Sequence, residues 1–151
     1  MVKNMLVKAV INEKYNNTEV HVCKDVSDEE VKNLINDISQ MVNGELVAQA
    51  ENGDREILNR MNVVRFYADN QKVVADVSGK KYTISKKLYE LEVELDEQNF
   101  FRISKSEIIN LKKIKKLDMS FTGTIKIIMK DDSESFTSRR TVVKLKKVLG
   151  L

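Results

Sequence analysis

Apolar positions in the first 50 residues alternate and then change to a helical spacing. Apolar side chains at every second position from 5 to 11 predict a strand with one buried face. Asn16-Asn17 predicts a turn, and a second short strand is expected over 18–23. Ser27-x-x-Glu30 is a capping box, and the apolar stripe that follows predicts a helix ending at Asn43-Gly44. With a last strand over 45–50, residues 1–50 are expected to form a small β-β-α-β unit.

From about residue 55 the pattern changes to closely spaced short strands. Three runs rich in β-branched and aromatic residues are separated by polar turns, and turns this short join antiparallel neighbours. Leucines at three- and four-residue spacing then predict a short helix over 88–95. The runs are 63–67, 72–77 and 82–84, and the turns are Asp69-Asn70-Gln71 and Ser78-Gly79.

The last third of the chain repeats this alternation and closes with a helix. A second capping box, Ser104-x-x-Glu107, predicts one or two helical turns after a strand over 100–103. An amphipathic helix is expected from about Ser138 to the end. The fold class is therefore α+β, with residues 55–151 forming a mainly antiparallel β domain with a C-terminal helix. Its further antiparallel strands are expected over 114–119, 124–129 and 135–137.

Charge is distributed unevenly along the chain. Residues 99–151 carry 13 Lys and Arg against 5 Asp and Glu, a net charge of +8. The whole chain carries only +3, so residues 1–98 carry −5. Either the basic end meets a polyanion, or its lysines only keep a small domain in solution.

No pattern in the sequence predicts catalysis or metal binding. His21 is the only histidine and fits a structural or surface role, and one thiol, Cys23, makes neither an intrachain disulfide nor a metal site. Phosphate-binding loops and nucleophile motifs are missing, so no cofactor, metal or small-molecule substrate is expected. No apolar run approaches the roughly 18–20 residues that span a bilayer, and the N-terminus does not resemble a signal peptide. We therefore expect a complete cytoplasmic protein.

Nucleic-acid binding fits the basic end, but not through a helix-turn-helix or zinc-finger pattern. The adjacent Phe100 and Phe101 face opposite sides of a strand, which argues against the stacked aromatics of an RNA-binding sheet. Ser104-Lys105-Ser106 and Ser138-Arg139-Arg140 each place cations at an expected helix start, where free N–H groups attract phosphate. Arginine also presents two parallel donors to guanine. Alternatively, these cations pair with surface carboxylates or stay hydrated.

Several segments in order resemble the LytTR DNA-binding domain. They are FYADNQKVVADVSGKKYTISKKLYEL at 66–91, FFRISKSEIIN at 100–110, IKKL at 114–117, GTIKIIM at 123–129 and the SRR-plus-helix ending. Phe101, Arg102, Ser106 and Asn110 have the family's typical spacing, as do Ser138 and Arg140. The resemblance covers roughly 57–151.

The resemblance implies an elongated β domain that inserts residues from three loops into successive major grooves of double-stranded DNA. It assigns base contacts to Gln71, with Lys72 as the alternative, to Lys105, for which a phosphate contact is the alternative, and to Arg140. Phosphate or supporting contacts are expected from a further set of polar and basic residues. These are Lys72, Ser104, Ser106, Lys112, Lys113, Ser138, Arg139, Lys144 and Lys147.

The resemblance is to stand-alone LytTR regulators, because residues 1–50 carry no receiver-like acidic pocket. Such regulators imply a homodimer on repeated promoter sites and a small membrane protein that restrains them. The N-terminal unit is expected to be a dimer contact, a docking surface or a stabilising extension. Two rival functions remain. One is a protein-interaction module on a LytTR scaffold with vestigial DNA binding, and the other is an RNA-associated protein.

Overall fold

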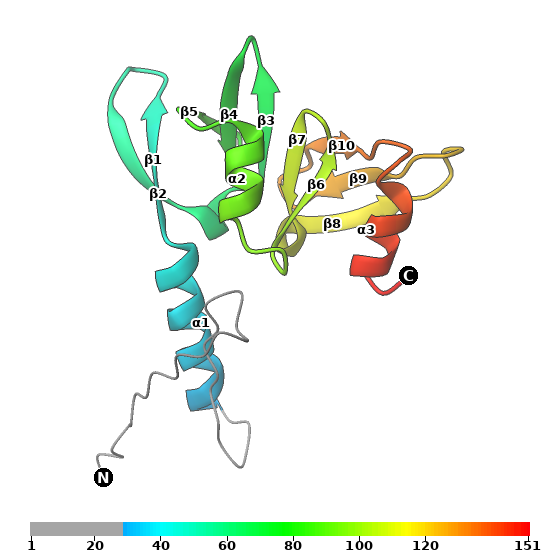
Figure 1. Cartoon of the computed structure of the whole chain (residues 1–151), viewed down its shortest axis with the longest axis horizontal. Coiled ribbons are helices and arrows are strands. Elements are labelled where there is room, and N and C mark those ends of the chain that lie inside the picture. Colours follow the sequence, from blue (N-terminus) through cyan, green and yellow to red (C-terminus); the bar gives the residue numbers. More distant parts are fainter. Residues whose placement is uncertain (1–28) are drawn as a thin grey trace, which may run out of the picture. The chain divides into compact units, whose positions relative to one another are not determined.

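The computed structural model describes residues 29–151 (Figure 1). The strands predicted over 5–11 and 18–23, together with His21, Cys23 and Ser27, lie outside the described residues. The chain divides into two units, 1–35 and 36–151, and the boundary falls within helix α1 (Glu29–Asn43). This helix confirms the prediction for this segment, and it ends directly before Gly44.

The second unit is built on a seven-stranded antiparallel sheet. Its strands have the spatial order β2-β1-β5-β4-β3-β7-β6. They are β1 (Glu45–Ala50), β2 (Arg55–Asn59), β3 (Arg65–Asp69), β4 (Lys72–Val77), β5 (Lys80–Ile84), β6 (Phe100–Ser104) and β7 (Glu107–Asn110). A 3-10 turn, η1 (Arg60–Asn62), joins β2 to β3.

The predicted three-strand meander is present, with tight turns at both connections. Asn70 and Gln71 have φ values of 46° and 65°, and Ser78 and Gly79 have 52° and 90°. Two consecutive positive φ values match the right-handed twist of a two-residue hairpin. Strand β4 has the predicted bounds, whereas β3 is shifted two residues toward the C-terminus.

Helix α2 (Leu88–Glu94) covers one face of this sheet and forms the first hydrophobic core. It contacts β3, β6 and β7, and it buries Leu88 and Leu91. Leu95, Phe66 and Phe100 complete the contact, and the two phenyl rings lie 6.0 Å apart. Burying a side chain such as Leu91 contributes about 1.5–3 kcal/mol. The leucine spacing in the sequence therefore predicted this helix correctly.

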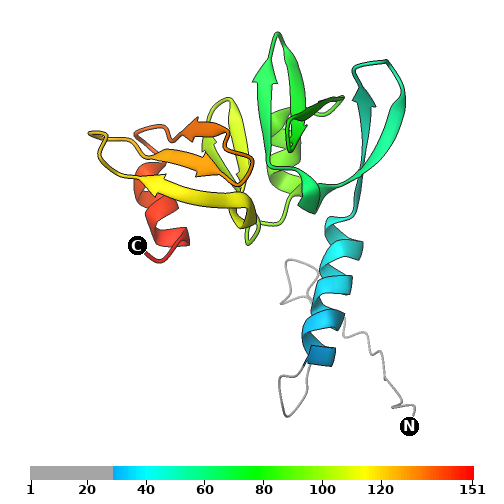
Figure 2. The ribbon, with the colours of Figure 1, turned by 180° about the vertical axis from the view of Figure 1, so that it is seen from behind.

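A three-stranded sheet and the C-terminal helix enclose a second core on the other side of β6 and β7 (Figure 2). The sheet has the order β10-β9-β8 and is entered through the 3-10 turn η2 (Leu111–Lys113). Phe101 and Ile109 belong to this core, whereas Phe100 and Ile108 belong to the first, so neighbouring residues do face opposite sides. The remaining elements are β8 (Ile114–Asp118), β9 (Lys126–Met129), β10 (Glu134–Phe136) and α3 (Val142–Val148).

Strand β1 has other partners than the sequence suggests. The sequence places residues 45–50 with the N-terminal unit, whereas β1 pairs with β2 and β5 of the seven-stranded sheet. Its strict alternation buries Leu46, Ala48 and Ala50 in the first core. The pairing of β1 with β5, some 30 residues further along the chain, leaves no trace in a local pattern. Strand β2, which pairs only with the neighbouring β1 at the edge of the sheet, was not predicted as a separate strand.

Two predicted helix starts are wrong. Ser104-x-x-Glu107 closes the β6–β7 hairpin instead of opening a helix, because Ile108 and Ile109 are buried on opposite faces of the sheet. A strand satisfies burial on both faces, whereas a helical turn does not. The final helix begins at Val142, four residues later than the predicted Ser138.

Candidate nucleic-acid interface

The β3–β4 turn carries the first predicted base contact. Gln71 is exposed and has a φ of 65°, a value that costs a non-glycine residue about 1–2 kcal/mol. Lys72 follows as the first residue of β4 and pairs with Asp69 across the hairpin. The turn therefore presents Gln71 and Lys72 side by side at the tip of a two-stranded ribbon.

The β6–β7 turn carries the second predicted contact. Lys105 and Ser106 are exposed at its tip, and Ser104 is half-buried. The Ser106 N–H donates to the Ser104 hydroxyl at 3.3 Å, so this turn offers no free helix terminus to a phosphate. A bulge between Arg102 and Ser104 shifts the register just before the turn. Lys105 is thus held on a hairpin, and not on the helix that the capping box suggested.

The turn before α3 carries the third predicted contact. Arg139 and Arg140 are exposed, and Ser138 is half-buried. The Ser138 N–H and the Thr141 hydroxyl both donate to the carbonyl of Ile103, at 2.8 and 2.6 Å. These two bonds fix the turn to β6 and leave both arginine side chains toward solvent.

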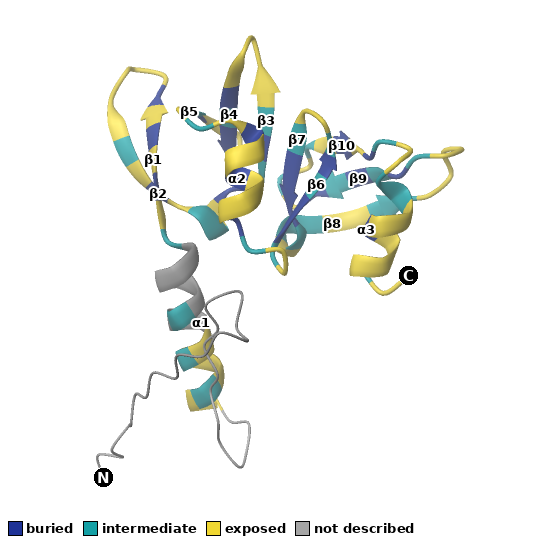
Figure 3. Ribbon diagram, viewed as in Figure 1, coloured by how far each residue is buried: buried dark blue, intermediate teal, exposed yellow. Residues whose placement is uncertain are grey.

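Backbone contacts bring the three turns to one end of the domain. The Ala68 N–H, just before the first turn, donates to the carbonyl of Ser106 in the second at 2.8 Å. Ile103, to which the third turn is bonded, lies two residues before Lys105. Figure 3 shows the tips of the β3–β4 and β6–β7 hairpins exposed, above strands whose lower parts are buried. The structure therefore assembles Gln71, Lys105 and Arg140, which are far apart in the sequence, on one surface, here called the three-turn surface.

The cations of this surface have no carboxylate partner in the described part of the chain. Within residues 29–151, no carboxylate lies within 4.0 Å of the charged groups of Lys72, Lys105, Arg139 or Arg140. By contrast, nearby Arg102 is paired with Glu92 at 2.6 Å. An exposed, unpaired set of cations produces the positive potential that a phosphate backbone requires.

The predicted supporting lysines fall into two groups. Lys144 and Lys147 are exposed on α3, directly after the third turn, and the Lys144 ammonium lies 6.0 Å from the centre of the Phe101 ring. Lys112 and Lys113 belong to η2, at the opposite end of β7 from Lys105. The structure therefore places the first pair beside the three-turn surface and leaves the second pair away from it.

A buried polar side chain at the end of β7 has hydrogen-bond partners at both ends of its amide. Asn110 is fully buried, and its side-chain amide donates to the carbonyls of Met61 and Val63 at 3.0 and 2.9 Å. Its amide oxygen accepts from the Lys112 N–H at 3.0 Å. One side chain thus joins η1 to the end of the β6–β7 hairpin, which explains an asparagine after the two buried isoleucines of β7.

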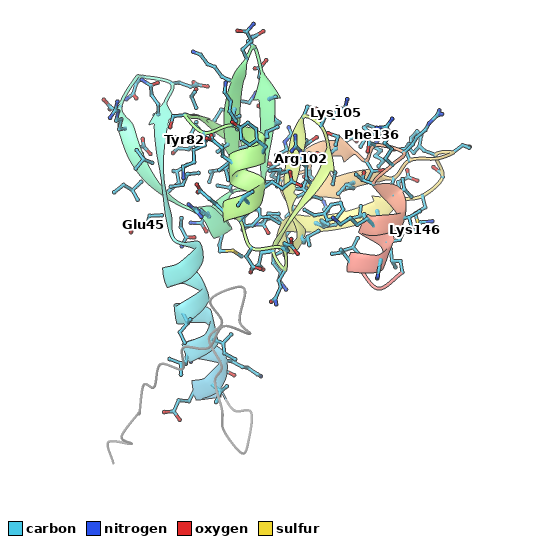
Figure 4. All side chains as sticks on the ribbon, in the orientation of Figure 1. Glu45, Tyr82, Arg102, Lys105, Phe136 and Lys146 are labelled. Atoms are coloured by element: carbon cyan, nitrogen blue, oxygen red, sulfur yellow. The ribbon has the colours of Figure 1, made fainter. Side chains whose placement is uncertain are left out.

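Arg102 has a role that was not predicted from the sequence. Its guanidinium donates to the carbonyls of Ser104 and Lys105 at 3.2 and 2.7 Å, and to Glu92 of α2 at 2.6 Å. Figure 4 shows Arg102 below Lys105 on the same hairpin. The sequence shows only an arginine within a predicted strand. The partners of Arg102 could not be predicted, because they depend on where α2 packs.

Residues 29–151 contain no group of three or more His, Cys, Asp or Glu side chains that could hold a metal ion. In the same residues, no helix combines the length and apolar character needed to cross a bilayer. A shallow hollow of about 320 Å³ lies beside Lys86 and, on α2, beside Tyr89 and Val93.

Comparison with known proteins connects this geometry to a family. Residues 53–150 match the model of the LytTr DNA-binding domain. A protein of Staphylococcus aureus strain MSSA476, described as an uncharacterized HTH-type transcriptional regulator, is 31% identical over 148 residues, which are 98% of this chain and 97% of that protein. A counterpart from strain NCTC 8325 has the same identity and coverage. A solved LytTr DNA-binding domain from Bacillus cereus, 20% identical, has a TM-score of 0.67 over 71% of this chain and 97% of that chain.

The term HTH in these relatives' names does not describe the fold found in residues 29–151. In this part of the chain, helices α1 and α2 are followed by strands, and α3 is the last element. Two consecutive helices joined by a tight turn are therefore not formed there.

Proposed function

The chain belongs to the LytTR family of DNA-binding domains, and from this premise we propose that it is a bacterial, sequence-specific transcription regulator. The observation that carries the proposal is the three-turn surface. It combines Gln71, Lys105 and Arg140 on two hairpin tips and one helix-preceding turn, with unpaired cations around them. The chain acts where the chromosome is, in the cytoplasm.

The proposed mode of binding is insertion of the turns into the major groove. A major groove about 12 Å wide admits a two-stranded ribbon, and both the β3–β4 and β6–β7 tips have that form. Arg140 donates two parallel hydrogen bonds to a guanine, and Gln71 is suited to an adenine. Lys105 contributes one mobile charge, which a guanine acceptor or a phosphate would bind. Base sequence is thus recognised by three side chains from three separate turns.

Phosphate contacts supply affinity without selecting a sequence. The residues proposed for them are Lys72 and Arg139, beside the proposed base contacts, and Lys144 and Lys147 on α3. Ser104, Ser106 and Ser138 support the same turns with hydroxyl groups. Lys112 and Lys113 lie at the other end of β7, so they do not belong to this surface.

Assembly and regulation are further parts of the proposal. A homodimer on repeated promoter sites would double the length of DNA contacted, and a small membrane protein would restrain the regulator. We propose that residues 1–50 receive the regulatory signal, because all the proposed DNA contacts come from later residues. Light scattering of the full chain with and without duplex DNA tests the dimer directly.

DNA binding is tested by titrating the full chain against three probes at equal salt. The first probe, the selected duplex, is the sequence that the full chain enriches from duplexes with a randomised centre. The others are a random duplex and a structured RNA. We expect binding to the selected duplex to be about 10³-fold or more tighter than to the random duplex. Equal affinity for both duplexes, or preference for the RNA, would contradict the proposal and favour a protein-interaction or RNA-associated role.

A further inference from the structure

Arg102 connects helix α2 to the backbone of the Lys105 turn. One terminal nitrogen of its guanidinium donates to the Glu92 carboxylate at 2.6 Å, and the other donates to the Lys105 carbonyl at 2.7 Å. The Nε–H donates to the Ser104 carbonyl at 3.2 Å. All three bonds come from one planar group, so the turn, the end of β6 and α2 are held in a fixed relation.

The geometry of arginine explains why this connection is specific. The guanidinium presents its donors in a rigid fork, and its hydrogen bonds to a carboxylate are charge-assisted. A lysine at the same position could bind either the Glu92 carboxylate or the turn carbonyls, but not both, because its ammonium is a single point charge on a flexible stem. The Arg102 side chain is 26% exposed and that of Glu92 is 49% exposed, so water competes for these bonds and it is their number, three from one group, that holds the turn.

Lys105 depends on such support more than Gln71 or Arg140 would. A lysine side chain is flexible, so the direction in which it leaves the surface is set mainly by the backbone that carries it. A contact that distinguishes bases has to be held close to its productive geometry by the residues around it. The carbonyl that Arg102 binds belongs to Lys105 itself.

We infer that Arg102 and Glu92 form a positioning pair that fixes the Lys105 turn and thereby sets base preference at the Lys105 contact. The inference rests on the proposed function, because it presumes that Lys105 contacts a base. Neither Arg102 nor Glu92 is proposed to contact DNA. Glu92 orients Arg102 from α2, and Arg102 orients the turn.

The chain contains a matched control. Arg60 also joins the sheet region to α2, through Glu94 at 3.2 Å, but it bonds to none of the three turns. Arg60→Ala therefore removes an ion pair to the same helix and leaves the Lys105 turn intact. Arg102→Lys keeps the positive charge and most of the stem, and Glu92→Gln leaves Arg102 present but removes its charged partner.

The experiment measures, for each full-chain variant, the affinity for the selected duplex and for the random duplex, together with the bases enriched from the randomised library. We expect Arg102→Lys and Glu92→Gln to lower affinity for the selected duplex by about 3- to 10-fold, with random binding nearly unchanged. Base preference should relax at the position that Lys105→Ala also relaxes. Adding Arg102→Lys to Lys105→Ala should give little further loss, because Arg102 acts through Lys105 and coupled residues are not additive.

The outcomes separate this inference from the proposed function. If the wild-type chain enriches no sequence, or if Lys105→Ala changes nothing, the proposed Lys105 contact fails and the inference fails with it. If Lys105→Ala relaxes one position but Arg102→Lys does not, the positioning pair alone is wrong. The same holds if Arg60→Ala gives the effect of Arg102→Lys, because the role would then be a general one in holding α2.

Discussion

Gln71 is in a backbone conformation that glycine adopts more easily than glutamine. Replacing it by glycine should therefore raise the stability of the fold and lower the affinity for specific DNA. Gln71, with a φ of 65° in a two-residue hairpin turn, is at the position at which glycine is preferred after asparagine, and Asn70 precedes it. Gln71→Gly should therefore stabilise the fold. If Gln71 contacts a base, the same substitution should weaken specific DNA binding.

The magnitude follows from two opposing terms. Relief of the left-handed conformation contributes about 1–2 kcal/mol, and the greater backbone freedom of glycine in the unfolded chain subtracts about 0.5–1 kcal/mol. The net gain is about 0.5–1 kcal/mol, which corresponds to a rise in Tm of roughly 2–5 °C for a domain of this size. Loss of a bidentate base contact should weaken binding to the selected duplex by about 1–3 kcal/mol.

The assay combines thermal unfolding with titration of the selected and random duplexes. Ser78→Gly is the matched control, because Ser78 has a φ of 52° in the β4–β5 turn, at the other end of β4. It should raise Tm by a similar amount and leave DNA binding unchanged. A fall in Tm for Gln71→Gly would refute the conformational argument. Unchanged binding to the selected duplex would show that Gln71 contacts no base.

Three further predictions concern the buried amide, one ion pair and one phosphate contact. Asn110→Ala removes the partner of the buried Val63 carbonyl and of the part-buried Met61 carbonyl and Lys112 N–H, and urea unfolding should show a loss of about 2–4 kcal/mol. The Lys86 ammonium, 2.6 Å away, holds the pKa of the Glu94 carboxyl below its usual value. The ion pair therefore stabilises the fold at pH values above the pKa that Glu94 has in the unfolded chain. This stabilisation is lost as the pH falls through the lower pKa that Glu94 has in the folded chain. Glu94→Gln should thus be less stable than wild type near neutral pH, with the difference disappearing in acid, and a gap independent of pH would contradict this. Arg139→Ala should reduce the slope of log K against log salt by about 0.9 for both duplexes, whereas a loss confined to the selected duplex would make Arg139 a base contact.

Local patterns in the sequence predicted much of the sheet and its turns. Strand β4 was predicted with its observed bounds, and the leucine spacing predicted α2. Polar residues at 69–71 and 78–79 predicted the two hairpin turns that the structure contains. These features depend on neighbouring residues, which is why alternation and turn composition were sufficient to find them.

The remaining features depend on contacts between distant segments. Strand β1 pairs with β2 and β5 in the seven-stranded sheet. The segment Ser104-x-x-Glu107 forms a hairpin and not the predicted helix start, because Ile108 and Ile109 are buried on opposite faces of the sheet. The bond between Arg102 and Glu92 likewise exists only because α2 packs against that hairpin. Family resemblance named the candidate site residues, but only the folded chain shows that their turns meet at one end.

Sequence-specific recognition through the three-turn surface is tested most directly at Arg140. The measurement is the affinity of Arg140→Ala for the selected and random duplexes at one salt concentration, with Arg139→Ala as the neighbouring control. We predict that Arg140→Ala weakens binding to the selected duplex by about 1–3 kcal/mol, roughly 5- to 150-fold, and leaves random binding nearly unchanged. Arg139→Ala should weaken both. Unchanged binding of Arg140→Ala to the selected duplex, or an equal loss on both duplexes, would contradict base recognition from this surface.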